Sequence, residues 1–319
     1  MHFKRAAVLY INRLYLKNSV IRQGKSGKDM RIIKKLILII FILVLAAAGV
    51  VVYSYFDQNK LSYELYHLYS DKVAVGENIR VIALADLHNK EFGKDNAELI
   101  EEVARMKPDI IVIAGDMVDK SQDNTSTALN LCLRLKEIAP LYYGFGNHES
   151  NMVYVQGIRF DEELKAAGIN LLINSAQTLN IKDTDIDIGS VATGSDDDEY
   201  ERYSADFVKE FEDYEPDTHL KLMITHFPSL YYDKMKDAKF DLGICGHLHG
   251  GQIRLPIVGG LYAEWNHKIE LFPKYCYGKF ELDNCTIIVS RGLGNHEIVP
   301  RINNRPEITV IDINSRPES

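Results

Sequence analysis

Five apolar runs in this chain each end in residues with polar, metal-binding side chains. The runs have the length and composition of buried strands, for example Ile79 to Ala85 and Ile110 to Ala114. Because successive strands of an α/β sheet present their carboxyl ends at one edge, we expect the polar residues to converge. These residues are Asp86 and His88, Asp116, Asn147 and His148, His226, and His247 and His249.

Helical patterns alternate with the expected strands. In residues 95–106, apolar residues recur at helical spacing, and this alternation predicts an α/β architecture. Residues 171–191 and 279–289 have the pattern of further short strands, so we predict a second sheet packed on the first. The 263 residues from Asp57 onward are enough for one large domain with a substantial core.

The polar residues offer carboxylate, imidazole and one amide oxygen, with no thiolate among them. Such a set suits Mn²⁺, Fe or Zn²⁺ better than a soft ion. The number of ligands implies two ions. A single strand-end Asp or His is more often a cap or a turn residue, so the inference depends on the complete ordered set.

The order of these blocks resembles the calcineurin-like metallophosphoesterase superfamily, in particular a membrane-anchored bacterial branch of it. The similar stretch runs from Ile79 to Gly250 and contains D-x-H, G-D, G-N-H-E, H and G-H-x-H in that order. The resemblance implies a four-layer αββα sandwich of two mixed sheets. It also implies a metal-dependent phosphoric ester hydrolase with two divalent ions.

Carried over residue by residue, the resemblance assigns the ligands of both ions. One ion would take Asp86, His88, Asp116 and His249, and the other Asp116, Asn147, His226 and His247. Asp116 would bridge two ions about 3.5 to 4 Å apart, which can clamp a phosphoryl oxygen while activating a water. The i, i+2 spacing within the D-x-H and H-x-H blocks would put both side chains of a pair on one side of an extended segment.

His148 directly follows the ligand Asn147, so we assign it as the general acid for the leaving group. A histidine in that role needs an orienting partner on its other ring nitrogen. Asp119 has the spacing of the family's histidine-aspartate pair. The alternative for Asp119 is a turn or N-cap residue after a strand.

Two arginines are further candidates for contact with substrate. Arg254 follows two glycines after the last block and could pair with a phosphate bidentately, or it is a surface arginine. Arg301 ends a segment, residues 291–301, that resembles the closing segment of the same branch. That segment repeats the G-N-H-E tetrapeptide at 294–297. Because this second copy follows the last block, we favour the first copy, at 146–149, as the family's block. The alternative interpretation of the segment 291–301 is a tight turn before a final strand at 308–313.

The N-terminal region predicts a membrane anchor. Residues 36–53 contain no charge or strongly polar group, and the segment 36–56 has about the length that crosses a bilayer. Ten Lys or Arg and one acid, Asp29, precede it, so the positive-inside rule places the N-terminus in the cytoplasm and the catalytic domain outside. The competing interpretation is a signal peptide cleaved near Ala46 to Ala48.

We therefore predict four regions: a basic cytoplasmic segment at 1–35, a transmembrane helix at 36–56, a stalk or lead-in at 57–78, and a metallophosphoesterase domain at 79–319. The basic segment either lies on anionic lipid or is a disordered tail. Beyond it the chain has 27 basic and 44 acidic residues, a net charge of −17. This balance does not favour nucleic acid, and it disfavours a nuclease of the same superfamily.

The four cysteines do not form a disulfide scaffold. Cys132 and Cys245 lie in apolar patterns and are expected in the core, whereas Cys276 and Cys285 flank a hairpin and could pair outside the cell.

Together these features predict a membrane-anchored phosphoesterase that hydrolyses a small or lipid-linked phosphate ester by attack of metal-bound hydroxide. The alternative is a non-catalytic metal-binding domain of the cell envelope on the same fold. The sequence leaves open the metals, the oligomeric state, and the choice between monoester, diester and pyrophosphate.

Overall fold

The computed structural model describes residues 2–194, 202–214, 216–265, 268–295 and 299–316, with the backbone alone for residues 2–26, 264, 265 and 268. Contacts divide the chain into two units, Met1–Tyr53 and Ser54–Ser319. The repeated tetrapeptide lies partly outside the described residues, since 296–298 are not among them.

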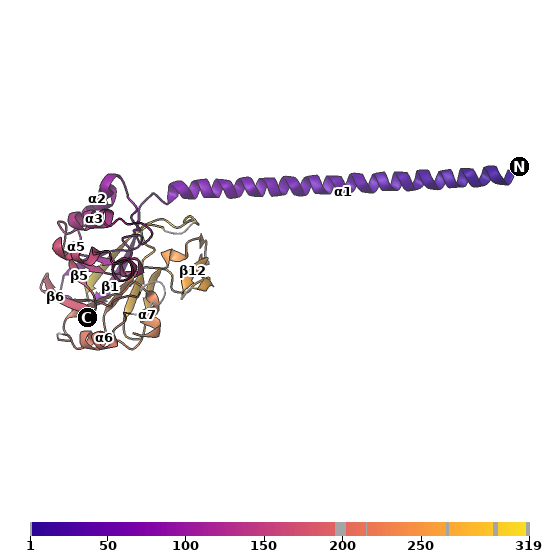
Figure 1. Cartoon of the computed structure of the whole chain (residues 1–319). Coiled ribbons are helices and arrows are strands. Elements are labelled where there is room, and N and C mark those ends of the chain that lie inside the picture. Colours follow the sequence, from indigo (N-terminus) through magenta and orange to yellow (C-terminus); the bar gives the residue numbers. More distant parts are fainter. Residues whose placement is uncertain (1, 195–201, 215, 266–267, 296–298, 317–319) are drawn as a thin grey trace. The chain divides into compact units, whose positions relative to one another are not determined.

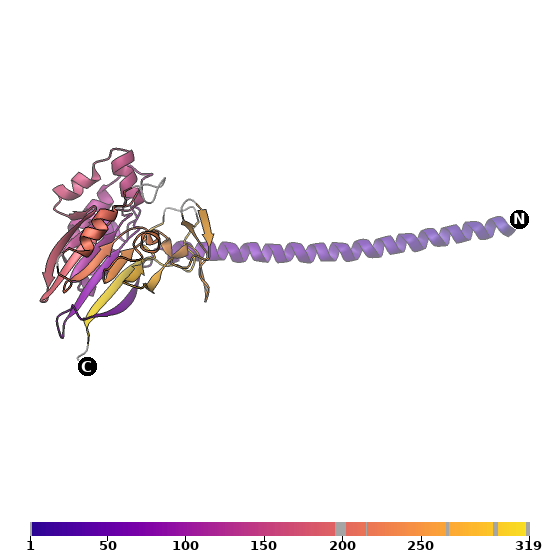
Figure 2. The ribbon, with the colours of Figure 1, turned by 90° about the horizontal axis from the view of Figure 1, so that it is seen from below.

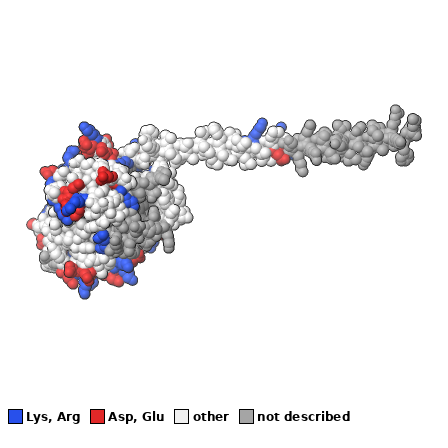
Figure 3. Space-filling view, viewed as in Figure 1, with Lys and Arg blue, Asp and Glu red and all other residues white. Residues whose placement is uncertain are grey.

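Most of helix α1, His2–Asp57, lies in the first unit, and its last turn belongs to the second; the helix also contains the basic segment. Its stretch Gly27–Asp57 is long and apolar enough to cross a membrane. Figure 3 shows charged side chains only near one end of the described part of this helix, and an uncharged surface along the rest. A helix whose apolar side chains are exposed all around is typical of a membrane span.

The second unit contains two six-stranded mixed sheets (Figures 1 and 2). In the first sheet the only antiparallel pair is β16 with β2. The order is β1 (Ser62–Ser70), β16 (Glu307–Ser315), β2 (Asn78–Leu84), β3 (Ile110–Ala114), β4 (Leu141–Gly144) and β5 (Asn170–Leu172).

The second sheet is antiparallel at its two outer pairs and parallel between them. Its order is β14 (Gly278–Glu281), β15 (Thr286–Val289), β9 (Leu242–Cys245), β8 (Leu220–Ile224), β7 (Thr184–Ser190) and β6 (Ser175–Ile181).

Side chains of the central strands alternate between two cores, because successive residues of a strand point to opposite faces. In β2, Val81 and Ala83 pack between the sheets, whereas Ile82 and Leu84 face the helices. Helices α2 (Ala97–Met106), α3 (Ser126–Leu135) and α5 (Phe160–Ala166) cover the first sheet, and α6 (Ala205–Glu212) and α7 (Pro228–Asp233) cover the second. The predicted four-layer αββα sandwich is confirmed.

Short elements complete the second unit. They are the short 3₁₀ helices η1 (Lys94–Asn96) and η3 (His249–Gly251), helix α4 (Asn147–Ser150), the short π-helix η2 (Asn151–Val155), and the ribbons β10 (Arg254–Leu255) with β11 (Gly259–Gly260) and β12 (Tyr262–Trp265) with β13 (Lys268–Leu271). The ribbons lie outside both sheets.

Two expectations need adjustment. The segment expected as a stalk or lead-in contains β1, which pairs in parallel along the whole of β16, so it is part of the first sheet. All four cysteines are free and buried, so Cys276 and Cys285 are not paired. Cys285 packs in one hydrophobic cluster and Cys276 in another, and this separation explains why these two do not meet.

Candidate metal centre

The predicted ligands follow the carboxyl ends of five central strands, as expected. The strands end at Leu84, Ala114, Gly144, Ile224 and Cys245. Parallel order within each sheet and the packing of the two sheets bring these ends to one rim. The side chains of Asp86, His88, Asp116, Asn147, His226 and His249 are buried there, and His247 is partly buried.

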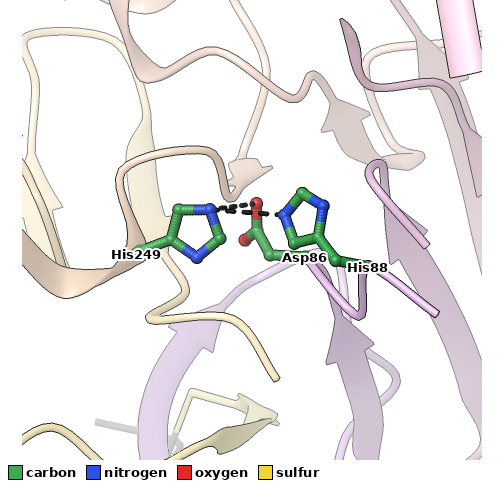
Figure 4. A group of neighbouring side chains, drawn as sticks. All are labelled: Asp86, His88 and His249. Atoms are coloured by element: carbon green, nitrogen blue, oxygen red, sulfur yellow. Dashed lines mark hydrogen bonds and ion pairs between the residues drawn. The ribbon is translucent and has the colours of Figure 1, made fainter. Parts of the chain in front are cut away.

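The first group at this rim is Asp86, His88 and His249 (Figure 4). His249 Nε2 lies 3.3 Å from His88 Nε2 and 3.8 Å from Asp86 Oδ1. Two imidazole nitrogens and a carboxylate oxygen thus face one point, which is the arrangement that a divalent cation requires.

Asp116 belongs to the two other groups at this rim, one with His226 and His247 and one with His88 and His148. Its Oδ2 lies 2.9 Å from His226 Nε2 and 3.9 Å from His148 Nε2. The predicted bridging residue is therefore the side chain that these two groups share.

Backbone donors hold both carboxylates. Asp86 accepts hydrogen bonds from the backbone N–H of His247, at 3.0 Å to Oδ1, and Asp116 Oδ1 accepts one from the backbone N–H of His148 at 2.9 Å. Asn147, the amide ligand candidate, is buried between Gly146 and His148 at the start of α4. Each carboxylate is thus fixed by a loop that carries a different predicted ligand.

His226 shows that the group of residues fits a cation. Its Nδ1–H donates to the carbonyl of Ala114 at 2.7 Å, so in the neutral ring Nε2 carries a lone pair. That nitrogen faces the carboxylates of Asp116 and Asp86, at 2.9 and 3.8 Å. A lone pair facing two buried carboxylates is favourable only with a positive charge between them, either a proton or a metal ion.

The pKa values show the same electrostatic field. Burial alone would lower the pKa of His226, but Asp116 and Asp86 raise it to about 9. Burial raises the pKa of Asp86 to about 7. Burial would also raise the pKa of Asp116, but His226 and His148 hold it well below its usual value.

Five of the predicted ligands adopt a left-handed backbone, which is uncommon for residues other than glycine. The φ angles are 54° at Asp86, 49° at His88, 55° at Asp116, 75° at His247 and 46° at His249. The expectation that the D-x-H and H-x-H pairs lie on extended segments was therefore wrong. Sharp turns after the strands bring these side chains together, and such local strain is often found at functional sites.

His148 lies beside the groups, but its contacts differ from the prediction. Its Nδ1 accepts a hydrogen bond from the backbone N–H of Lys120 at 3.1 Å, whereas Asp119 Oδ1 is 3.8 Å away, too far for a hydrogen bond. Asp119 Oδ1 instead accepts from the N–H and hydroxyl of Ser121. Because Nδ1 is an acceptor, the neutral ring carries its proton on Nε2, the nitrogen that faces Asp116.

The two arginines occupy different places. Arg301 is 1% exposed; its Nη2 lies 3.1 Å from His249 Nδ1, and its Nε donates to the carbonyl of Gly294. Burial lowers its pKa to about 10, so it stays cationic near neutral pH. Arg254 is in β10, with its guanidinium 3.7 Å above the Tyr277 ring.

The sequence reasoning missed Glu149, the last residue of the G-N-H-E block. It is fully buried and accepts hydrogen bonds from the backbone N–H groups of Asp116, Met117 and Gly146 and from the Tyr143 hydroxyl, all between 2.7 and 2.9 Å. It therefore ties the turn that carries Asp116 to the turn that carries Asn147. The signal available in the sequence was the position of Glu149 directly after the predicted site residues Asn147 and His148. A glutamate at such a buried position is unusual and needs hydrogen-bond partners.

Comparison with known proteins agrees with this geometry. The sequence model of the calcineurin-like phosphoesterase family matches residues 79–251, more than half of the chain. The chain belongs to the calcineurin-like phosphoesterase family. The matched stretch contains every residue of the three groups that contain Asp86 or Asp116.

Relatives of this phosphoesterase are found in several bacteria. Phosphodiesterase YaeI of Escherichia coli (strain K12) is 31% identical over 238 residues, 73% of this chain and 82% of that protein. The uncharacterized metallophosphoesterase YkoQ of Bacillus subtilis (strain 168) is 26% identical over 246 residues, 75% of this chain and 85% of that protein. A solved dimetal phosphatase from Danio rerio aligns with a TM-score of 0.41 and 10% identity, over 67% of this chain and 88% of the other.

Proposed function

We propose that this protein is a membrane-anchored phosphoesterase that uses two divalent metal ions to hydrolyse a phosphate ester outside the cytoplasmic membrane. The observation that carries the proposal is the position of Asp116, which forms one group with His226 and His247 and another with His148 and His88, a residue of the Asp86 group. Two bound cations, about 3.5 to 4 Å apart, would stabilise charge on the phosphoryl group and lower the pKa of a coordinated water to about 7.

The residues of the chain have distinct proposed roles. Asp86, His88, Asp116 and His249 hold one ion, and Asp116, Asn147, His226 and His247 hold the other. Mn²⁺, Fe and Zn²⁺ all suit this mixture of carboxylate, imidazole and amide ligands. The hydrogen bond from His226 to Ala114 fixes the ring so that Nε2 points to the carboxylates.

His148 is the proposed general acid. Its Nδ1 is occupied by the backbone N–H of Lys120, so the proton of the neutral ring is on Nε2, next to the bridging carboxylate. As general acid the ring would be protonated on both nitrogens, with Nδ1–H facing Asp119 in place of the contact with the Lys120 N–H. Its Nε2 proton would pass to a leaving-group oxygen and leave a neutral imidazole. Asp119, at 3.8 Å from Nδ1, stabilises the ring when it is charged. Arg301, whose Nη2 lies 3.1 Å from His249 Nδ1, orients the His249 ring. Arg254, on the ribbon that follows the centre, contributes to substrate binding.

The anchor and the substrate complete the proposal. The apolar segment 36–56, within the long stretch Gly27–Asp57, and the ten basic residues that precede residue 36 favour an N-terminus in the cytoplasm. The acidic balance of the remainder disfavours nucleic acid as substrate. A small or lipid-linked phosphate ester fits better, and since one relative is named a phosphodiesterase, a diester is the first bond type to test.

The test measures hydrolysis by the full chain in detergent with Mn²⁺, Zn²⁺ or Fe²⁺. Two diesters are compared, one with a 4-nitrophenol leaving group and one with an alkyl leaving group. Asp116→Asn should reduce turnover of both by at least about 10³-fold, because several kcal/mol of metal stabilisation are lost. His148→Ala should reduce alkyl-ester turnover by about 10²-fold or more and affect the nitrophenyl ester less.

His67→Ala, on β1 and distant in sequence from the family blocks, is the matched control and should leave turnover unchanged. Equal loss on both esters in His148→Ala would contradict the general-acid role. Turnover that survives in Asp116→Asn would place the activity elsewhere. No turnover with any divalent metal would favour a non-catalytic metal-binding domain.

A further inference from the structure

The two ribbons after the candidate metal centre carry exposed apolar side chains. We call residues 252–277, which contain β10 to β13, the ribbon lobe; β12 is labelled in Figure 1, at the edge of the domain. Relative exposures reach 108% at Ile257, 72% at Ile269 and 64% at Leu271. The exposed apolar residues of the lobe are Leu255, Ile257, Val258, Ile269, Leu271 and Phe272.

The lobe is anchored directly on the candidate metal centre. Leu248, between His247 and His249, packs with Ala263 and Cys276 in a small buried cluster. The backbone N–H of Leu261 donates to the carbonyl of Gly251, the last residue of the turn that begins at His249. The base of the lobe therefore borders the ligands, and its apolar residues lie on the solvent side.

Backbone conformation gives no reason for large apolar residues at the ends of the ribbons. Ile257, in the turn between β10 and β11, has a φ of 71°, and Phe272, after β13, has a φ of 56°. Both are exposed. Large side chains, and β-branched ones above all, rarely adopt this conformation, and here no core packing compensates for it. An interaction outside the described chain would explain these residues.

The charge of the lobe differs from that of the rest of the second unit. Residues 252–277 carry Arg254, Lys268 and Lys274 against Glu264 and Glu270, a net charge of +1. The chain beyond residue 35 has a net charge of −17. A lobe with apolar tips and a positive balance complements the surface of an anionic bilayer, whereas most of the domain would be repelled by it.

We propose that the ribbon lobe docks on the surface of an anionic phospholipid bilayer. This inference rests on the proposed membrane anchor, because the short connection of residues 58–61 between α1 and β1 would tether the domain that carries the lobe to the bilayer. Apolar side chains of the lobe enter the headgroup region, and the basic residues contact lipid phosphates. Docking would place the candidate centre beside phosphate esters carried by the bilayer.

The test uses the single tryptophan of the chain, Trp265, which lies in β12. The full chain is reconstituted into vesicles of phosphatidylcholine and phosphatidylglycerol, with or without bromine on the acyl chains. Because α1 contains no tryptophan, quenching reports on the lobe alone. We expect a loss of emission in brominated vesicles. The double variant Ile257→Asp with Leu271→Asp should recover it.

Val75→Asp is the matched control, since Val75 is 75% exposed and lies outside the lobe, and its emission should match that of the unaltered protein. Equal emission in both kinds of vesicle overturns the docking. A chain that does not float with vesicles overturns both the docking and the anchor. Equal emission together with a dimer that the double variant dissociates would assign the lobe to a second copy of the chain instead. Quenching without phosphoesterase turnover supports the docking and contradicts only the proposed function.

Discussion

At the scale of single residues, Glu149 determines the relative position of two ligand loops. Its two carboxylate oxygens each accept two hydrogen bonds, Oε2 from the backbone of Asp116 and Gly146, and Oε1 from Met117 and the Tyr143 hydroxyl. Burial raises the pKa of Glu149, and these donors oppose that shift. The side chain thus has no spare acceptor, and its removal leaves buried N–H groups unpaired.

Glu149→Gln tests this role. A glutamine has one acceptor oxygen, so at least one buried backbone N–H loses its partner, which costs about 1 to 3 kcal/mol of unfolding free energy. Metal affinity should fall by about 10- to 100-fold, as is typical when a residue that orients ligands is changed. Urea unfolding and metal titration measure both. Glu163→Gln, an exposed glutamate with one side-chain hydrogen bond, is the control and should change neither.

His226 predicts a pH dependence of the metal-free protein. Burial alone lowers its pKa, but Asp116 and Asp86 raise it from 6.5 to about 9. A raised pKa means that the folded state binds the proton more tightly, so this stabilisation is present below pH 6.5 and is lost as the pH rises through 9. The pKa of Asp86, raised by burial to about 7, acts in the same direction at lower pH.

The urea midpoint of the metal-free protein should therefore fall between pH 6.5 and pH 9. Saturating Mn²⁺ should remove the effect, because the imidazole then binds a cation in place of the proton. A midpoint of the metal-free protein that is constant or rises over this range would show that His226 does not face the two carboxylates.

At the scale of elements, the centre depends on the close approach of the loops after β3 and β4. Gly115 has a φ of 85°, and a Cβ there would lie 2.5 Å from the backbone nitrogen of Gly146 and 2.7 Å from His226 Nδ1. No side chain fits in this space. The glycine of the G-D block is thus required by geometry as well as by conformation.

Gly115→Ala should lower the unfolding free energy by more than the roughly 1 to 2 kcal/mol expected for a left-handed alanine, and it should abolish binding of both ions. Gly157→Ala provides the comparison. Gly157 has a similar φ of 76° with nothing within 4 Å of the added Cβ. The Gly157→Ala protein should therefore lose only the conformational part of the unfolding free energy and should still bind both metal ions. Equal effects at the two positions would refute the close approach of the loops.

The sequence predicted some of these elements and not others. Central strands such as β3 and β8 are buried on both faces, so they appear as continuous apolar runs. Strand β1 was not predicted, because most of its side chains are exposed and its apolar residues fall on both faces. The ligand set could be predicted because the residue types follow the strands in order. The left-handed turns and the Lys120 contact to His148 could not, since they depend on how the loops pack.

At the scale of the whole molecule, the anchor predicts that the chain is an integral membrane protein. The full mass of 36.3 kDa should be retained and should stay with membranes after an alkaline wash. An arginine near the centre of the span, in Leu45→Arg, makes the free energy of membrane insertion less favourable by about 3 kcal/mol. A fraction of the Leu45→Arg protein should therefore be released from the membranes. Phe56→Arg, near the end of the span, should be tolerated because a long side chain can reach the interface. A shortened, soluble chain would instead indicate a cleaved signal peptide.

The account as a whole depends on two cations on either side of Asp116. The most direct measurement is a crystal structure of the Mn²⁺-loaded protein with anomalous scattering. We predict two anomalous peaks about 3.5 to 4 Å apart, with a carboxylate oxygen of Asp116 within bonding distance of each. A single peak, or a pair of peaks that Asp116 does not join, would contradict the account.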